Sequence, residues 1–361
     1  MTATLGTSTS IGTSASAGGT GLGTDACDVR ELLERCRDAV TPALRAAVDR
    51  LDDASRAQAA YHLGWTELDG SPGRGGGKAV RPALARLSAA AVGAPASEAV
   101  PAAVAVELVH NFSLLHDDLM DGDTERRHRP TVWSRWGASS AILCGDALLA
   151  LASEVLLESG SAHAPAATRM LAATTRELIR GQVEDLAFET RDDVGVAECL
   201  SMAAGKTGSL LAAAASIGAV LAGGPEAARS GLSTYGMEVG MAFQLVDDLL
   251  GIWGDPGITG KPVRADLRSR KKTLPITYAV TRGGAAGREL AAWLAADGEP
   301  DEDGLLRAAA LVEAGGGRDW ARAEADRRMD RAERALDGAG LDPRTHAELV
   351  ALGRYLADRQ Y

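Results

Sequence analysis

The sequence predicts an all-α protein, and three observations carry that prediction. The chain has 361 residues, of which 46% are hydrophobic and only 4% aromatic, and it is rich in alanine, which favours helices. Apolar residues recur at helical spacing between breaks that contain glycine or proline. No alternating strand pattern separates these segments, so a βαβ architecture is disfavoured. We expect one helical domain over residues 25–361.

Composition also narrows the class of protein. The net charge is −11, from 38 basic and 49 acidic residues, which argues against a general nucleic-acid binder. The four cysteines (Cys27, Cys36, Cys144 and Cys199) form no close metal pair, so we interpret them as reduced thiols of a cytoplasmic protein. No run of 18 apolar residues occurs, and we expect no membrane span.

Residues 1–24 form a tail of a different kind. They are nearly all Gly, Ala, Ser and Thr and carry no charge. A signal peptide needs a basic start and a continuous apolar run, and this segment has neither. We expect a disordered tail, which is either inert or a docking segment for a partner.

The segment from Pro101 to Asp121 predicts the first of two acidic helices. Its apolar face consists of residues spaced by three or four, namely Val104, Leu108, Phe112, Leu115 and Leu119. Asp117 and Asp121 project from one face, with Asp118 beside them. Three carboxylates at a helix C-terminus repel one another and oppose the helix dipole, so a cation such as Mg²⁺ is the expected partner. A solvated acidic helix end is the alternative.

The segment from Gly231 to Pro256 predicts the second acidic helix. Its apolar stripe consists of Val239, Phe243, Val246 and Leu250. A neighbouring stripe carries Gln244, Asp247, Asp248 and Gly251. Two such helices facing each other would cage several Mg²⁺ ions and a diphosphate.

Lysine is rare, and each lysine lies in a loop or helix-end motif. The five are Lys78, Lys206, Lys261, Lys271 and Lys272. Three of the motifs, GGKAVRP, AGKTGSL and TGKPV, contain glycine, which lets the backbone approach a phosphate while lysine supplies charge. None is a Walker A loop, because Ala79 follows Lys78 where Ser or Thr is required. Chance placement is the alternative to a site for a non-nucleotide diphosphate.

Together the motifs resemble the trans-isoprenyl diphosphate synthase (polyprenyl synthetase) family, from about residue 28 to the C-terminus. In order they are GGKAVRP, HNFSLLHDDLMDGDTERR, GQVED, GKTGSL, FQLVDD, GDP with TGK, and KKTLP. The resemblance is greatest to geranylgeranyl diphosphate synthases. It implies antiparallel helices around a central active-site cavity and a homodimer. It also implies Mg²⁺-dependent head-to-tail condensation of isopentenyl diphosphate with an allylic diphosphate.

The resemblance also implies residue roles. Three Mg²⁺ ions with bound diphosphate are expected on Asp117, Asp121, Asp247 and Asp185, supported by Asp118, Asp248 and Gln182. Contacts to the allylic diphosphate are expected from Arg126, Lys206, Thr207, Gln244 and Lys261. The isopentenyl diphosphate site is expected at Lys78, Arg81, His110 and Arg127, and Lys271 matches a basic residue of the KxTxP motif. The group expected to act directly in catalysis is Asp117, Asp118, Asp121, Asp247 and Lys206.

The chain departs from the family at Gly251, which stands where the second motif normally has its third Asp. Either the metal site is weaker, or Asp255 or water takes the place of the missing carboxylate. We predict an active enzyme, with a weakly active accessory subunit as the alternative. The DDLLGIWGDP sequence and the tail also resemble prenyltransferases packaged in encapsulin nanocompartments, so residues 1–24 are a candidate shell-docking segment.

Phe112 and Ser113, just before the first acidic motif, are the expected chain-length residues. Five residues of helix rise about 7.5 Å, which is enough for Phe112 to close the cavity under a growing tail. One aromatic here resembles the geranylgeranyl (C20) type, and farnesyl (C15) is the alternative. Phe112 as an ordinary core residue is also open. A class I terpene cyclase is disfavoured, because Gly251 occupies the Ser/Thr position of its second metal motif.

Overall fold

A computed structural model of the chain describes residues 28–73, 75, 77–255 and 263–358, and it confirms the all-α prediction. The helices are α1 (Val29–Val48), α2 (Asp53–His62), α3 (Val80–Ala91), α4 (Val100–Met120), α5 (Val132–Trp136), α6 (Ala138–Leu157), α7 (Ala164–Glu189), α8 (Val196–Ala203), the π-helix η1 (Ala204–Gly208), α9 (Ser209–Leu221), α10 (Glu226–Trp253), α12 (Ala265–Arg268), α13 (Leu274–Arg282), α14 (Gly284–Leu294), α15 (Glu302–Ala314), α16 (Gly317–Asp337) and α17 (Pro343–Ala357).

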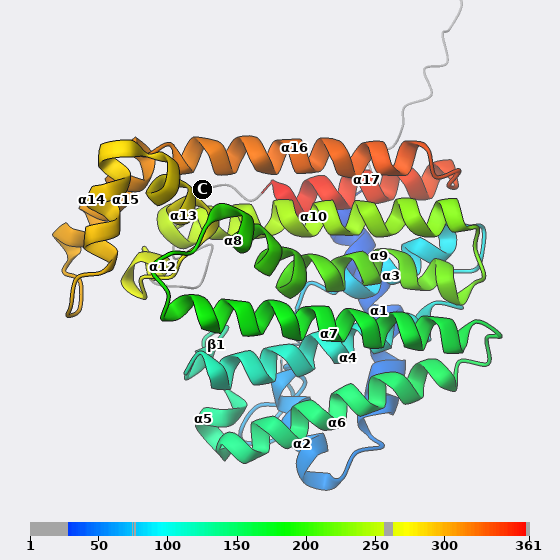
Figure 1. Ribbon diagram of the computed structural model, residues 1–361. Helices are drawn as coiled ribbons and strands as arrows, with labels where there is room; N and C mark the ends of the chain where they lie inside the picture. The colour runs from blue at the N-terminus through cyan, green and yellow to red at the C-terminus, as the bar shows by residue number, and fades with distance from the viewer. Residues whose placement is uncertain (1–27, 74, 76, 256–262, 359–361) are drawn as a thin grey trace, which may run out of the picture.

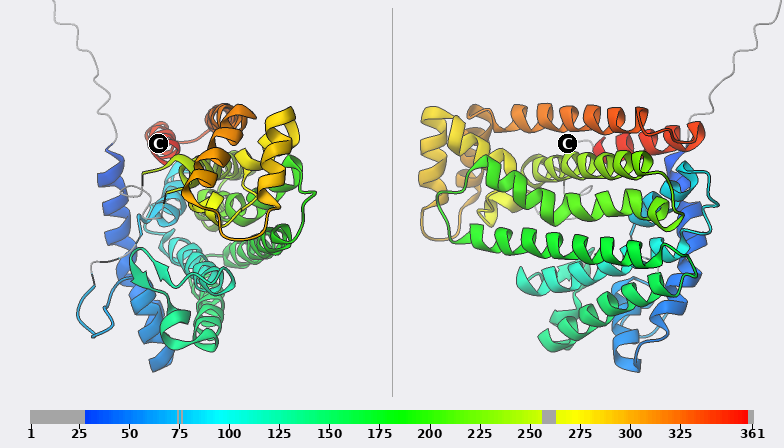
Figure 2. Two further views of the ribbon diagram at one scale, coloured as in Figure 1. Left: turned by 90° about the vertical axis from the view of Figure 1, so that its left-hand side faces the viewer. Right: turned by 45° about the vertical axis from the view of Figure 1, so that its right-hand side comes forward.

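The long helices form a bundle whose members run side by side (Figures 1 and 2). Helices α16, α10, α9, α7, α4 and α6 follow one another across the bundle in Figure 1, and α3 lies behind α9. Helix α1 crosses at the back, and α12 to α15 form a smaller group at one end. This arrangement agrees with the expected helical architecture.

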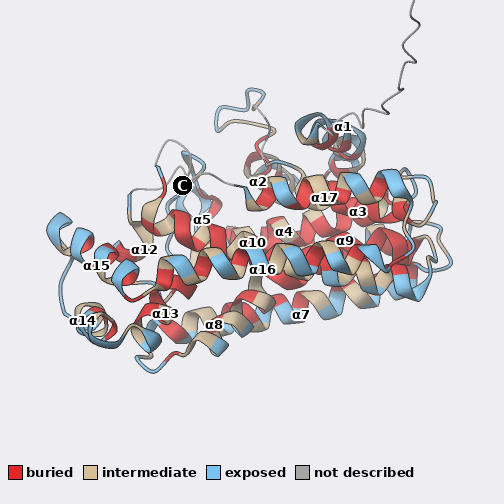
Figure 3. Ribbon diagram, turned by 90° about the horizontal axis from the view of Figure 1, so that it is seen from above, coloured by how far each residue is buried: buried red, intermediate tan, exposed pale blue. Residues whose placement is uncertain are grey.

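Helix α9 lies at the centre of the bundle. All of its residues are buried, and it packs against α10, α3, α7 and α4. A helix that is apolar on every side needs neighbours on every side, and its many alanines allow those neighbours to approach closely. Figure 3 shows the same distribution, with buried residues on the inner sides of the helices and exposed residues outside.

The two acidic helices lie close to their predicted positions. Helix α4 has Pro101 in its first turn, and it ends at Met120, just before Gly122 with a φ of 71°. Helix α10 begins at Glu226 rather than at the predicted Gly231, because Pro225 in extended conformation precedes the first turn. The predicted apolar faces are buried or partly buried in both helices.

A small hairpin between α4 and α5 was not predicted. Strand β1 (Glu125–Arg126) pairs antiparallel with β2 (Arg129–Pro130), with Arg126 opposite Arg129. The two linking residues, Arg127 and His128, have φ values of 54° and 60°. Positive φ at both central residues is the geometry of a two-residue hairpin turn, usually formed by Asn or Gly. Because the sequence has neither Asn nor Gly at these two positions, it lacks the usual sequence signal for a hairpin turn.

Two helical segments are long and apolar enough to cross a membrane, by length and composition alone. One is Val196–Leu221, whose most apolar 18-residue window is 83% buried in the bundle. The other is Ala138–Leu157, whose corresponding window is 39% buried. The first is therefore a core helix of the bundle. The second has an outward apolar side, which bears on the oligomeric state proposed below.

Candidate active site

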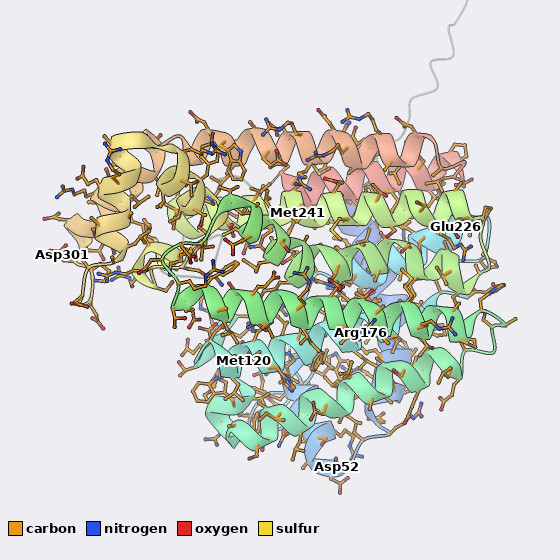
Figure 4. All side chains as sticks on the ribbon, viewed as in Figure 1. Asp52, Met120, Arg176, Glu226, Met241 and Asp301 are labelled. Carbon is orange, nitrogen blue, oxygen red and sulfur yellow. The ribbon has the colours of Figure 1, made fainter. Side chains whose placement is uncertain are left out.

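The acidic motifs lie at the same end of the bundle. Met120 marks the C-terminal end of α4, on the side of α12 to α15, whereas Glu226 marks the start of α10 at the opposite end (Figure 4). The second motif occupies the last two turns of α10. The C-terminal part of α7, which carries the GQVED sequence, reaches the same end.

Glycine contacts between helices bring the basic GKTG segment to the carboxylate of Asp185. A side chain at Gly181 would overlap the backbone of Lys206, and one at Gly205 would overlap the carbonyl of Glu177. Because both positions are glycine, α7 and η1 touch through their backbones. The Lys206 Nζ then donates to Asp185 Oδ2 at 2.7 Å. The π-turn of η1 is a local feature that often marks functional sites.

A second glycine contact joins η1 to α10. A side chain at Gly240 would press on the backbone of Gly208. One turn further along α10, the Thr207 hydroxyl donates to Gln244 Oε1 at 2.7 Å. The Gln244 amide in turn donates to Asp248 Oδ1 at 2.7 Å. The other oxygen of Asp248 accepts the backbone N–H of Leu274 at 2.9 Å.

Asp185 lies between two lysines. Lys271 Nζ also donates to Asp185 Oδ2, at 3.2 Å. Burial favours the neutral acid, but Lys271 and Lys206 outweigh it and lower the pKa of Asp185. Burial likewise opposes the charge on Lys271, yet the carboxylates of Asp185, Asp121 and Asp266 raise its pKa above the usual value. The opposite charges in this cluster therefore stabilise each other.

In the first acidic motif, burial and neighbouring charges raise the pKa of two carboxyl groups. Burial, with Asp121 and Asp185 nearby, raises the pKa of Asp117, although Lys206 opposes the shift. The Asp118 carboxylate is almost completely buried and accepts from Arg126 Nε at 2.6 Å. Burial raises the pKa of Asp118 to about 6 even though Arg126 opposes it. An additional positive charge near this motif would stabilise the ionised forms of its carboxylates.

The site contains oxygen ligands of the kind that Mg²⁺ prefers. The side-chain amide of Gln182 is buried, and neither its nitrogen nor its oxygen has a hydrogen-bond partner. Such a polar group needs a partner such as ordered water. The two acidic motifs supply carboxylates, which hard cations prefer. Within the described ranges no three His, Cys, Asp or Glu side chains converge into a ready metal site. The chemistry of these residues is compatible with Mg²⁺.

A second polar region is mainly cationic and adjoins α3 and α4. Burial opposes the charge on Arg81 and lowers its pKa, while Glu107 favours it. Burial beside Arg81 and Arg127 holds the pKa of His110 well below its usual value. Lys78 Nζ lies 6.0 Å from the ring centre of Tyr355. Arg81, Arg127 and His110 thus act on one another electrostatically, and a substrate role for them and for Lys78 stays a prediction.

Sequence reasoning missed three residues in these two regions. Glu107 is the acidic neighbour of Arg81, and its carboxylate also accepts from the Asn111 amide at 3.3 Å. A lone carboxylate in an apolar helix would have been a usable signal. His62 lines a cavity of about 230 Å³ together with Arg126 and Arg127. Asp266 approaches the second motif from a separate helix, which no local pattern reveals.

The chain-length residues lie inside the bundle. Phe112 is 5% exposed and packs edge-on against His116, with ring centres 4.8 Å apart. The Ser113 hydroxyl donates to the carbonyl of His110 at 2.8 Å. Both are packed residues of α4, so the role of Phe112 in chain length stays a prediction. Lys261 and the 1–24 tail lie outside the described residues.

The fold is a helical bundle with two acidic helices, and Lys206 and Lys271 lie at its charged centre. Comparisons with known proteins identify the class of protein that has this arrangement. Residues 73–311 match the polyprenyl synthetase family model. The chain is 54% identical to a (2E,6E)-farnesyl diphosphate synthase of Mycobacterium tuberculosis, covering 91% of this chain and 93% of that protein. It is 44% identical to a geranylgeranyl diphosphate synthase of the same organism, covering 92% and 94%.

Solved structures agree with these sequence comparisons. A polyprenyl synthetase from Streptomyces coelicolor A3(2) matches with a TM-score of 0.88 and 53% identity, covering 91% of this chain and 99% of that one. The chain therefore belongs to the polyprenyl synthetase family, and it is a prenyltransferase of the prenyl diphosphate synthase class. Identity to relatives of both names leaves the product length open.

Proposed function

We propose that the chain condenses isopentenyl diphosphate head-to-tail with an allylic diphosphate in a Mg²⁺-dependent reaction. The observation that carries the proposal is the centre formed by Asp185, Lys206 and Lys271. Asp185 and Lys206 act electrostatically on Asp117 of α4, and η1, which carries Lys206, packs against α10. The carboxylates around this centre suit Mg²⁺ and its lysines suit a diphosphate. Asp117, Asp121, Asp247 and Asp185 are the proposed ligands, with Gln182 and Asp248 in support.

The lysines change partners when the allylic substrate binds. Lys206 and Lys271 both form ion pairs with Asp185, and in the proposed complex their side chains turn towards the diphosphate. Arg126 and Lys261 complete the proposed phosphate contacts, and Thr207 and Gln244 position the same group. When bound, Mg²⁺ supplies positive charge that neutralises the departing diphosphate. The fixed cations of the chain stabilise the same developing charge.

The second substrate occupies the cationic region. Lys78, Arg81, His110 and Arg127 are the proposed contacts for isopentenyl diphosphate. Glu107, which is paired electrostatically with Arg81, orients its guanidinium. The double bond of isopentenyl diphosphate attacks the allylic carbon as the C–O bond to diphosphate breaks, and the departing diphosphate takes the proton that the resulting cation loses, so the chain needs no nucleophile of its own. The apolar faces of the bundle shield the carbocation from water.

The proposed product is geranylgeranyl diphosphate (C20), and farnesyl diphosphate (C15) is the second candidate. Phe112 supports the C20 product, because it lies about 7.5 Å before Asp117 along α4 and is buried in the bundle. The 54% identity to a farnesyl diphosphate synthase supports the C15 product. Both products come from the same chemistry and differ only in how many condensations the cavity permits.

A product assay tests the proposal. The full chain is incubated with Mg²⁺, isopentenyl diphosphate and, separately, C5, C10 and C15 allylic diphosphates, and the products are sized by mass spectrometry. We expect C20 as the longest major product. A C15 product retains the enzyme and corrects the chain length. No product with any primer would refute catalysis and favour the accessory role that Gly251 suggested.

We further propose a homodimer in the cytoplasm. Helix α6 exposes Ile142, Leu143 and Leu157, and neighbouring α7 exposes Ile179 and Val183. An apolar surface of this kind favours a second copy of the chain as its cover. Light scattering after size exclusion should give twice the 37.3 kDa mass of the chain. Leu143→Arg should give the single mass, and binding of the wild type to lipid vesicles instead would contradict the dimer.

A further inference from the structure

The space beside Gly251 is filled by a carboxylate from another helix. A Cβ placed on Gly251 would overlap both carboxyl oxygens of Asp266, which lies in α12. Gly251 follows Asp247 by one helical turn, so the two positions share a face of α10. The family's missing third carboxylate belongs at this position. The space that it would use therefore contains the carboxylate of Asp266.

The other glycines of α10 have a different explanation. Side chains at Gly231, Gly236 and Gly240 would each meet backbone or alanine atoms of a helix packed against α10. These three permit close helix crossings. Gly251 instead faces an acidic side chain. Glycine in a helix costs about 0.5–1 kcal/mol relative to alanine, so each position needs a reason, and at Gly251 the reason is Asp266.

Helix α12 is tied to the centre of the site. The backbone carbonyl of Asp266 accepts the N–H of Lys271 at 2.8 Å, and the Lys271 side chain bonds to Asp185. The Asp266 carboxylate also acts electrostatically on both Asp248 and Lys271. Asp266 thus lies within the charge cluster rather than on an unrelated surface.

We propose that Asp266 supplies the third carboxylate of the second acidic motif, and that Gly251 is the residue that admits it. The inference rests on the proposed Mg²⁺-dependent function. It names Asp266 rather than Asp255 or water as the substitute for the missing Asp. It also predicts that a side chain at position 251 and the carboxylate at position 266 exclude each other.

Thermal melting of the full chain, with Mg²⁺ titrated in the presence of inorganic pyrophosphate, tests this exchange. Asp266→Asn removes the charge and keeps the shape. We expect it to raise the half-effective Mg²⁺ concentration about tenfold, as losses of groups around a metal typically do. Gly251→Ala should act in the same direction, because its methyl group displaces Asp266. The double variant Gly251→Asp/Asp266→Ala should regain most of the loss.

Controls separate metal binding from folding. Asp303→Asn removes an exposed carboxylate in the first turn of α15 and should leave the Mg²⁺ response unchanged. Melting in EDTA reports the fold alone, and there Asp266→Asn should resemble the wild type. A wild-type Mg²⁺ response in Asp266→Asn, or an equal loss in EDTA and in Mg²⁺, would overturn the inference alone. No Mg²⁺ response in the wild type would overturn the Mg²⁺ dependence under the proposed function as well.

Discussion

The two acidic helices hold their inner carboxylates in different ways. On α4, Asp118 is paired with a cation, Arg126, at 2.6 Å. On α10, Asp248 is held by two neutral donors, the Gln244 amide and the Leu274 N–H. Burial raises the pKa of Asp118 to about 6 and that of Asp248 to about 7. Arg126 opposes the shift at Asp118, whereas the neighbouring carboxylates of Asp266 and Asp247 add to the shift at Asp248.

The partners of the two inner carboxylates also differ in how they would contact the substrate phosphate. The Arg126 guanidinium that pairs with Asp118 is also a proposed phosphate contact, whereas Gln244 reaches the phosphate region through Thr207. Under the proposed function, the first motif is therefore coupled to substrate through charge, and the second through a chain of neutral hydrogen bonds.

The largest expected loss of activity comes from replacing a proposed Mg²⁺ ligand, Asp117 or Asp247. Asp117→Asn on α4 and Asp247→Asn on α10 should each lower kcat by about 10²- to 10³-fold, because each removes a proposed Mg²⁺ ligand while keeping the shape. Steady-state kinetics at saturating Mg²⁺ and both substrates measure the effect. Full activity in only one of the two variants would show that a single acidic helix carries the metal function.

Phe112→Ala on α4 should lengthen the product and lower the free energy of unfolding by about 3 kcal/mol, because it opens a cavity in the bundle. Phe243→Ala on α10 is the matched control, since Phe243 is partly buried on the predicted apolar stripe. It should lower stability without lengthening the product. Mass spectrometry of the products and denaturant unfolding give the two readouts. An unchanged product with Phe112→Ala would leave Phe112 as a core residue only.

Sequence patterns predicted both acidic helices because periodic apolar faces and proline or glycine stops are local signals. The sequence predicted that α4 ends just before Gly122 and that Asp117 and Asp121 share one face of the helix. The pairing of Asp185 with Lys206 did not, because it depends on the packing of Gly181 against η1. The place of Asp266 was also hidden, since only tertiary structure brings α12 to Gly251.

A medium effect is expected from removing the partner of each inner carboxylate. Arg126→Gln should lower the free energy of unfolding by about 2 kcal/mol, because it leaves the buried Asp118 charge without its cation. Gln244→Leu should cost about 1 kcal/mol, because Asp248 keeps the Leu274 N–H and loses only a neutral donor. Urea unfolding in EDTA measures both. Equal losses would show that the charge of Arg126 contributes nothing special.

The smallest effect concerns His62, which lies beside the same arginine pair that follows α4. Burial, together with Arg126, Arg127 and Arg129, lowers the pKa of His62 to about 3. A folded-state pKa below the unfolded value of about 6.5 contributes stability above pH 6.5, and this contribution is lost as the pH falls.

Between pH 7 and pH 5.5 the loss for this one group is about 1 kcal/mol, since the unfolded chain takes up a proton that the folded chain refuses. His62→Gln should remove that part of the acid sensitivity while other groups keep theirs. Urea unfolding of both proteins at the two pH values isolates the difference. The same pH slope in the variant would mean that His62 takes up its proton in the folded protein, and that the arginines of the hairpin do not repel it.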